Sequence, residues 1–180
     1  MRIDRENTIG LIIDVQEKIY PAMNNKKDLL ANTSRLIMGL QEFGLPLIFT
    51  QQYTKGLGET LTEISKLVGG FSYVEKTAFS CYDEPSFVMA LEEVGAKNIL
   101  IAGIESHVCV LQTAIDLKAA GYNPIIVFDC VSSRTKESKK LALERFRYEG
   151  IMITSCESAL FELLRGAKAP EFKTISKLVK

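Results

Sequence analysis

One stretch of the chain decides the fold: Asn98-Ile-Leu-Ile-Ala-Gly-Ile-Glu-Ser-His-Val-Cys-Val-Leu-Gln-Thr-Ala-Ile-Asp-Leu-Lys-Ala-Ala120. Its first part, through Ile104, is almost uniformly apolar, which is typical of a strand buried in a parallel sheet. A turn follows, and from Val108 the apolar residues recur at helical spacing until Gly121. The stretch therefore predicts a strand, a turn and a helix, the repeating unit of an α/β fold.

The same alternation runs along the whole chain. Apolar runs predict strands at 8–15, 45–50, 72–75, 98–104, 124–129 and 151–154. Helical patterns predict helices at 27–43, 83–94, 108–120, 134–149 (capped by Ser132 or Ser133) and 157–164, and the tail 170–180 has a helical period. Residues 51–70 predict a loop or lid around a short helical piece. We expect a single α/β domain over residues 1–180, with helices on both faces of a mostly parallel sheet.

Composition limits the possible partners. Acidic and basic residues balance at 22 each, so no charge excess favours nucleic acid or an anionic membrane. No apolar run is long enough for a transmembrane helix. The first seven residues are too polar for a signal peptide, and the four cysteines are widely spaced. We therefore expect a cytoplasmic protein with reduced thiols, bound to neither nucleic acid nor membrane.

Cys109 is the residue with the greatest capacity for covalent chemistry. It lies where the predicted helix begins, close to unpaired backbone N–H groups and the positive end of the helix dipole. That setting favours a thiolate, the reactive form of cysteine. A free cysteine is also a small apolar side chain that is commonly buried and inert. The local pattern leaves both interpretations open.

Two further residues occupy corresponding places. Asp14 closes the first predicted strand and Lys76 follows the short strand at 72–75. Because parallel strands end at one edge of a sheet, Asp14, Lys76 and Cys109 are expected to meet there. The carboxylate can accept the thiol proton, and the lysine can hold both anions and lower the thiol pKa. A turn-capping aspartate and a solvated lysine are the alternatives. Asp129 is a rival strand-end carboxylate, for which we prefer a helix-capping or structural role because no lysine accompanies it in the sequence.

The pattern resembles the isochorismatase-like cysteine hydrolase superfamily, and most of all the isochorismatase domain-containing proteins. The resemblance rests on Leu11-Ile-Ile-Asp-Val-Gln16, Glu75-Lys-Thr-Ala-Phe-Ser80, Gly103-Ile-Glu-Ser-His-Val-Cys-Val110, the loop Thr50–Gly58, the segment Cys130–Arg134 and the tail after Pro170. It implies a six-stranded Rossmann-like α/β/α fold and a catalytic triad of Asp14, Lys76 and Cys109. It also implies a cis peptide between Ile104 and Glu105, with the backbone N–H groups of Glu105 and Cys109 forming an oxyanion hole.

The departures from the superfamily narrow the chemistry. Nicotinamidases of this group bind a metal through an aspartate and histidines after the second strand, where this chain has Gln51, Gln52 and Tyr53. We therefore expect no metal and no cofactor. Isochorismatases proper lack the cysteine, so Cys109 argues against cleavage of a vinyl ether. Expected contacts with the substrate come from five residues: Gln16, Gln52, Tyr53, Phe79 and His107.

The sequence thus predicts a metal-independent cysteine hydrolase that cleaves the C–N bond of a small amide through a thioester. The alternative is a non-catalytic or redox-sensing scaffold protein of the same fold. His107, two residues before Cys109, is expected to be a wall or surface residue rather than a partner of the thiol. Relatives commonly assemble, so we expect a homo-oligomer, either a dimer or a tetramer.

Overall fold

A six-stranded parallel sheet forms the centre of the computed structural model, which describes residues 2–180. The order of the strands is β3-β2-β1-β4-β5-β6, and all five neighbouring pairs are parallel. Their bounds are β1 (Thr8–Ile13), β2 (Leu47–Gln52), β3 (Val74–Lys76), β4 (Asn98–Ile104), β5 (Asn123–Ser132) and β6 (Met152–Thr154). The chain starts at β1 in the middle of the sheet, adds β2 and β3 on one side, and then returns to add β4, β5 and β6 on the other side. This is the Rossmann-like arrangement that was predicted.

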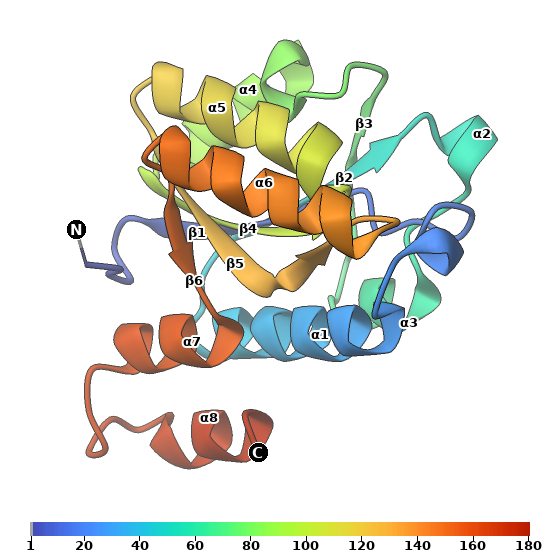
Figure 1. Cartoon of the computed structure of the whole chain (residues 1–180). Helices are drawn as coiled ribbons and strands as arrows, with labels where there is room; N and C mark the ends of the chain where they lie inside the picture. Colours follow the sequence, from blue (N-terminus) through green and yellow to red (C-terminus); the bar gives the residue numbers. More distant parts are fainter. Residues whose placement is uncertain (1) are drawn as a thin grey trace.

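Helices cover both faces of the sheet (Figure 1). One layer holds α1 (Lys26–Glu42), α7 (Cys156–Leu164) and, outside them, α8 (Phe172–Leu178). The other holds α4 (Pro85–Val94), α5 (Leu111–Ala119) and α6 (Lys136–Tyr148). Two short helices, α2 (Thr54–Leu57) and α3 (Thr62–Ser65), occupy the predicted loop between β2 and β3. The three-layer α/β/α fold class is confirmed.

The alternation of side chains along each strand produces two separate cores. In β1, Ile12 packs against α1, whereas Leu11 and Ile13 pack on the side of α4 and α5. Leu111 and Leu117 of α5 are buried in the second core, so they serve packing rather than an exposed surface. Because both faces of the sheet are covered, the central strands contain few polar residues before their carboxyl ends.

Several boundaries differ from the prediction. β5 extends through Ser132, because after a register shift Ile104 pairs with Ser132. The serines expected to cap α6 therefore lie at the end of a strand, and Thr135 caps the helix instead by accepting a hydrogen bond from the Ser138 N–H at 3.0 Å. Among residues 2–180, no helix has the length and apolar character needed to cross a membrane.

Candidate active site

The carboxyl edge of the sheet brings together the three predicted catalytic residues. Asp14 follows β1, Lys76 is the last residue of β3, and Cys109 lies in a π-helical turn (Ser106–Val110) between β4 and α5. Lys76 Nζ is 2.7 Å from Asp14 Oδ2, and both side chains are almost fully buried. The Cys109 thiol is also buried and interacts with the Asp14 carboxylate.

One oxygen of Asp14 is held by the fold and the other is available. Thr50 at the end of β2 donates a hydrogen bond to Asp14 Oδ1 at 2.7 Å. Asp14 Oδ2 faces the ammonium of Lys76, yet it accepts no hydrogen bond of good geometry from any residue that the structure describes. Burial raises the pKa of the Asp14 carboxyl, while Lys76 and Thr50 partly oppose that effect. Asp14 Oδ2 is therefore suited to take up a proton.

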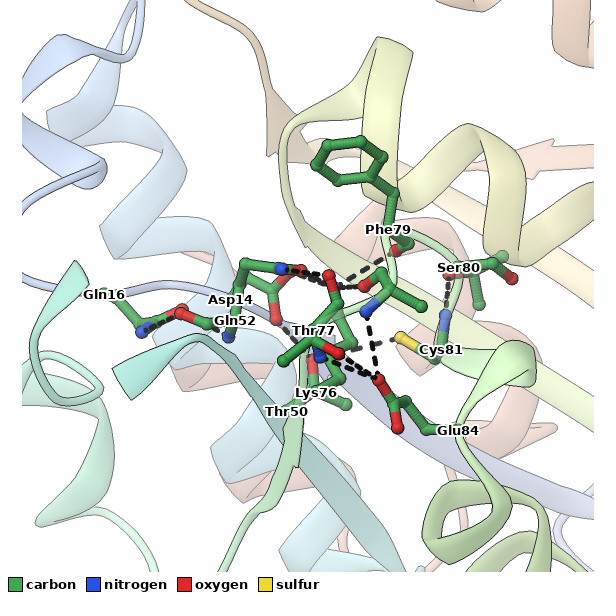
Figure 2. A network of polar contacts seen from close by, with 12 residues as sticks. Asp14, Gln16, Thr50, Gln52, Lys76, Thr77, Phe79, Ser80, Cys81 and Glu84 are labelled. Carbon is green, nitrogen blue, oxygen red and sulfur yellow. Dashed lines mark hydrogen bonds and ion pairs between the residues drawn. The ribbon is translucent and has the colours of Figure 1, made fainter. Parts of the chain in front are cut away.

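The ammonium of Lys76 has no donor left for a substrate. It donates to Gln52 Oε1 at 2.6 Å and to the carbonyl oxygens of Ala78 and Phe79 at 3.1 Å each (Figure 2). An ammonium has three N–H groups, so these three acceptors use all of them. Burial, the largest single influence, would lower the pKa of Lys76, but the negative charge of Asp14 and the influences of Cys81 and Cys109 together outweigh it, and the pKa is raised. Lys76 thus stays cationic and acts through its charge.

The protonation state of Cys109 differs from the sequence-based expectation. Burial, and next the negative charge of Asp14, raise the pKa of the Cys109 thiol to about 12, although Lys76 pulls it downward. The expectation of a thiol with a lowered pKa is wrong, because it counted the lysine and the helix dipole but not the loss of water. At neutral pH, Cys109 is a neutral thiol beside the carboxyl group of Asp14.

Gln16 and Gln52 have structural roles that the sequence did not predict. Gln16 is fully buried, and its side chain bonds to the backbone of Gln52 at both N–H and C=O and to the carbonyl of Gly58. Its polar atoms are used in joining the ends of β1 and β2, so the expected contact of Gln16 with a substrate is wrong. Gln52 accepts from Lys76 and donates to Thr77 O at 2.7 Å, which makes it a support of the lysine.

The other three expected substrate contacts lie at or near the surface. Tyr53 and Phe79 are 52% and 55% exposed. Tyr53 follows Gln52, whose side chain accepts a hydrogen bond from Lys76, and Phe79 supplies one of the carbonyl oxygens that Lys76 binds. His107 is partly buried, and its Nδ1 lies 2.9 Å from Ser133 Oγ. This contact links the imidazole to the segment after β5. The exposed aromatic rings remain candidates for binding a substrate.

Sequence reasoning missed the residue that shapes the turn after β3. Glu84 accepts hydrogen bonds from the N–H groups of Thr77 and Ala78 at 2.7 and 3.0 Å. These bonds, first that of Ala78, lower the pKa of the Glu84 carboxyl. The same turn presents the two carbonyls that Lys76 binds (Figure 2). No local sequence signal marks Glu84, because its partners come from the turn before it rather than from its own helix.

A close contact between strands places Asp14 beside the cysteine turn. Gly103 of β4 has φ +123°, and a Cβ there would lie 2.1 Å from the carbonyl oxygen of Ile13. Only glycine allows this approach, which occurs one residue before Asp14. The peptide bond between Ile104 and Glu105, which follows directly, is cis.

The rival carboxylate Asp129 has the predicted structural role. Its Oδ1 accepts the N–H of Cys156 at 2.8 Å, at the first residue of α7. The reason given for that role is wrong, however, because Lys139 of α6 is close enough to interact with Asp129 and with Cys130. Cys81, Cys130 and Cys156 are all buried core thiols.

Gln51, near the end of β2, binds residues of the loop that follows the strand. Gln51 Nε2 donates to Glu59 Oε2 and Thr60 Oγ1 at 3.1 and 3.0 Å. Within residues 2–180, no group of three or more histidine, cysteine, aspartate or glutamate side chains is arranged as metal ligands.

Comparison with known proteins identifies the family. The model of the Isochorismatase domain matches residues 8–158. The chain belongs to the isochorismatase family. Isochorismatase domain-containing protein 1 of Danio rerio is 38% identical over 168 residues, which are 93% of this chain and 59% of that protein. The chain thus spans about three fifths of the length of this relative. The secreted isochorismatase effector Isc1 of Phytophthora sojae is 36% identical over 99% of this chain and 87% of its own length.

A solved structure agrees with this assignment. The structure of MAR1 ribonuclease from Caenorhabditis elegans superposes with a TM-score of 0.93 at 32% identity, covering 99% of this chain and 92% of that one. Family membership places this chain among hydrolase folds of the isochorismatase type.

Proposed function

We propose that this protein is a cysteine hydrolase that cleaves the C–N bond of a small amide. One observation carries the proposal: Asp14 Oδ2 has no hydrogen-bond donor of good geometry among residues 2–180, while the Cys109 thiol lies against the same carboxylate. A base with a free lone pair beside a neutral thiol is the arrangement that nucleophilic catalysis requires. The thiol takes the place of a metal-bound water as the nucleophile.

The first half of the reaction forms a thioester. The thiol proton moves from Cys109 to Asp14 as the sulfur attacks the carbonyl carbon, because a thiol with a pKa of about 12 is not ionised beforehand at neutral pH. The N–H groups of Glu105 and Cys109 hold the oxyanion, and each such donor contributes about 2.7–4 kcal/mol in other enzymes. The C–N bond breaks, and Asp14 returns the proton to the departing amine.

The second half releases the acid. A water molecule gives a proton to Asp14, and its hydroxide adds to the thioester carbon. The C–S bond then breaks, and the proton on Asp14 restores the Cys109 thiol. Throughout both steps Lys76 keeps its positive charge close to Asp14, which favours the ionised carboxylate each time the proton leaves.

The raised thiol pKa separates this function from redox sensing by a scaffold of the same fold. Sensor cysteines are accessible and have a low pKa, because the thiolate is the form that peroxide oxidises. Cys109 is buried and its pKa is raised to about 12. The site therefore supports amide hydrolysis, in which a base acts during the attack.

The test is a panel of small primary and secondary amides, with RNA included because the similar protein of Caenorhabditis elegans is called a ribonuclease. We expect release of ammonia or amine and, at low pH, an acyl adduct on Cys109 detectable by intact-mass analysis. Cys109→Ser should lose both signals, whereas Cys156→Ala should retain them because that thiol lies in the core on the α1 side of the sheet, with polar contacts to Asn32 and Cys130. Cleavage of RNA that survives in Cys109→Ser, with no amide cleaved, would refute the proposal.

A further inference from the structure

The segment after β5 contacts Glu105–Val110, here called the oxyanion turn because it carries the two N–H groups assigned to the oxyanion. The mechanism above does not use that segment. The backbone N–H and the Nε of Arg134 both donate to Glu105 Oε2, at 3.2 and 3.1 Å. The Glu105 side chain is only 10% exposed, whereas that of Arg134 is 63% exposed. A nearly buried carboxylate is thus held by an arginine that covers it from the solvent side.

Glu105 is fixed at its backbone as well. Its carbonyl oxygen accepts the N–H groups of Val108 and Val110 at 3.0 and 3.2 Å, which close the turn that carries Cys109. With the carbonyl bound to the turn and the carboxylate bound to Arg134, Glu105 is held on two sides of its Cα. The N–H group of Glu105, one of the two assigned to the oxyanion, belongs to the preceding Ile104–Glu105 peptide, which joins the residue at the same Cα.

The backbone that leads to Arg134 is itself held by hydrogen bonds. Ser133 accepts the N–H of Asn24 at its carbonyl at 2.9 Å, and Ser132 Oγ donates to the carbonyl of Asn24 at 2.6 Å. On the other side, Ser133 Oγ contacts His107 at 2.9 Å. The segment 132–134 is therefore attached both to the loop before α1 and to the oxyanion turn.

We propose that Arg134 is a positioning residue that holds the Glu105 N–H in line with the developing oxyanion. This inference rests on the proposed function. Without the guanidinium, the Glu105 carboxylate keeps one donor among residues 2–180, the Arg134 backbone N–H. The side chain then rotates toward water, which shifts the Cα of Glu105 and with it the N–H of that residue. The effect is confined to reactions in which an oxyanion forms, because Arg134 does not contact Cys109, Asp14 or Lys76 through any hydrogen bond that the structure describes.

Two reagents distinguish that effect from a general loss of structure. p-Nitrophenyl acetate acetylates the thiol: the C–S bond forms, the bond to p-nitrophenolate breaks, the thiol proton passes to Asp14, and the carbonyl oxygen becomes an oxyanion on the way. Iodoacetamide alkylates the thiol by displacing iodide, with the proton again lost to Asp14 but with no oxyanion. Both reagents are neutral, so Arg134 has no anionic group of the reagent to bind. Rates are measured as modification of Cys109 by intact mass, with Cys109→Ser as the blank.

We expect Arg134→Gln to slow acetylation of Cys109 by about 10-fold, part of the roughly 10²–10³-fold effect of removing an oxyanion donor. Alkylation should change by less than about 2-fold, which also shows that the site is still folded. Glu105→Gln should slow acetylation similarly, and the double variant should be no slower than the worse single one, because both changes break one contact. Arg134→Lys, which keeps the charge but not the position of Nε, should restore only part of the rate. The matched control is Arg145→Gln, which breaks an Arg–Glu pair of the same 3.1 Å length on the exposed face of α6.

The possible results separate the two proposals. Equal acetylation rates in the wild-type protein and Arg134→Gln would overturn the positioning role and leave the hydrolase function in place. Slowing of both acetylation and alkylation by the same factor would also overturn it, since the change would then be structural. A wild-type protein that is alkylated at Cys109 but never acetylated would refute the oxyanion site, and with it the proposed function.

Discussion

Replacing Lys76 by methionine tests whether the buried ion pair defines the site. Methionine has a similar length and creates little space, so the change removes mainly the charge 2.7 Å from Asp14 and the three hydrogen bonds of the ammonium. Breaking a buried pair by removing one partner costs about 3–5 kcal/mol. We therefore expect Lys76→Met to lose about 4 kcal/mol of unfolding free energy at pH 7.

The loss should depend on pH in a defined direction. Burial already raises the pKa of Asp14, and without the lysine it rises further. A carboxyl whose pKa is raised in the folded state favours folding when it is protonated, and that contribution is lost as pH rises. The slope is about 1.4 kcal/mol per pH unit for one proton. The penalty of Lys76→Met should thus be smaller at pH 5 than at pH 7, and the slope for one proton sets the upper limit of that difference.

Urea unfolding at the two pH values measures both quantities, and two further variants interpret them. Asp14→Asn combined with Lys76→Met leaves no charge in the pocket and should be more stable than Lys76→Met alone. Arg145→Met breaks an exposed pair within α6 and should cost less than about 0.5 kcal/mol. A penalty for Lys76→Met below about 1 kcal/mol, or one that is equal at pH 5 and pH 7, would refute the reasoning.

Four other predictions follow from the same geometry. Glu84→Gln should cost about 1 kcal/mol of unfolding free energy at pH 7. The difference from the wild-type protein should vanish as pH falls below 4.5, the pKa of an unfolded glutamate, because a lowered folded pKa stabilises only the ionised form. A difference in urea midpoint that stays constant with pH would contradict this. Gly103→Ala should prevent folding or cost more than about 3 kcal/mol, whereas Gly44→Ala, at φ +67° with open space around it, should cost about 1–2 kcal/mol; similar circular-dichroism melting curves for the two would be the opposing result. Above pH 9 the wild-type protein should lose stability faster than Cys109→Ser, by about 1 kcal/mol at pH 10. The reason is that the folded thiol keeps its proton up to about pH 12, while the unfolded thiol loses it near pH 9.0. Parallel curves of stability against pH would argue against the raised thiol pKa. Light scattering should report a homo-oligomer, and a species of only 20.1 kDa would exclude one.

The sequence predicted most of the fold because its signals are local and repeated. The strand Asn98–Ile104 has the predicted bounds, since uninterrupted apolar residues end at a turn. The prediction failed where pairing decides the boundary: Ser132 is in β5 because a neighbouring strand continues beside it. Asp14, Lys76 and Cys109 could be selected because polar residues at the carboxyl ends of parallel strands meet at one edge.

What the sequence could not supply is the assignment of each donor and each acceptor. Gln16 and Gln52 are both polar residues near strand ends, and only their hydrogen bonds show that one is fully engaged in the scaffold and the other supports Lys76. The same limit explains the error about the Cys109 pKa. Charges can be counted in a sequence, but the loss of water around a group depends on what packs over it.

The raised pKa of Cys109 changes what the lysine contributes. If Lys76 lowered the thiol pKa enough to overcome burial, it would generate a thiolate at rest, and the site would react with any electrophile or oxidant that reached it. With its three N–H groups occupied, Lys76 instead opposes the rise in the pKa of Asp14 that burial causes, and so favours a carboxylate beside a neutral thiol. In the proposed mechanism, the nucleophile is then formed only when a carbonyl group is present for the sulfur to attack and two N–H groups are in place to donate hydrogen bonds to the oxyanion. Selectivity for acyl compounds would follow from this order of events, since an electrophile that forms no oxyanion gains nothing from the turn that carries Cys109.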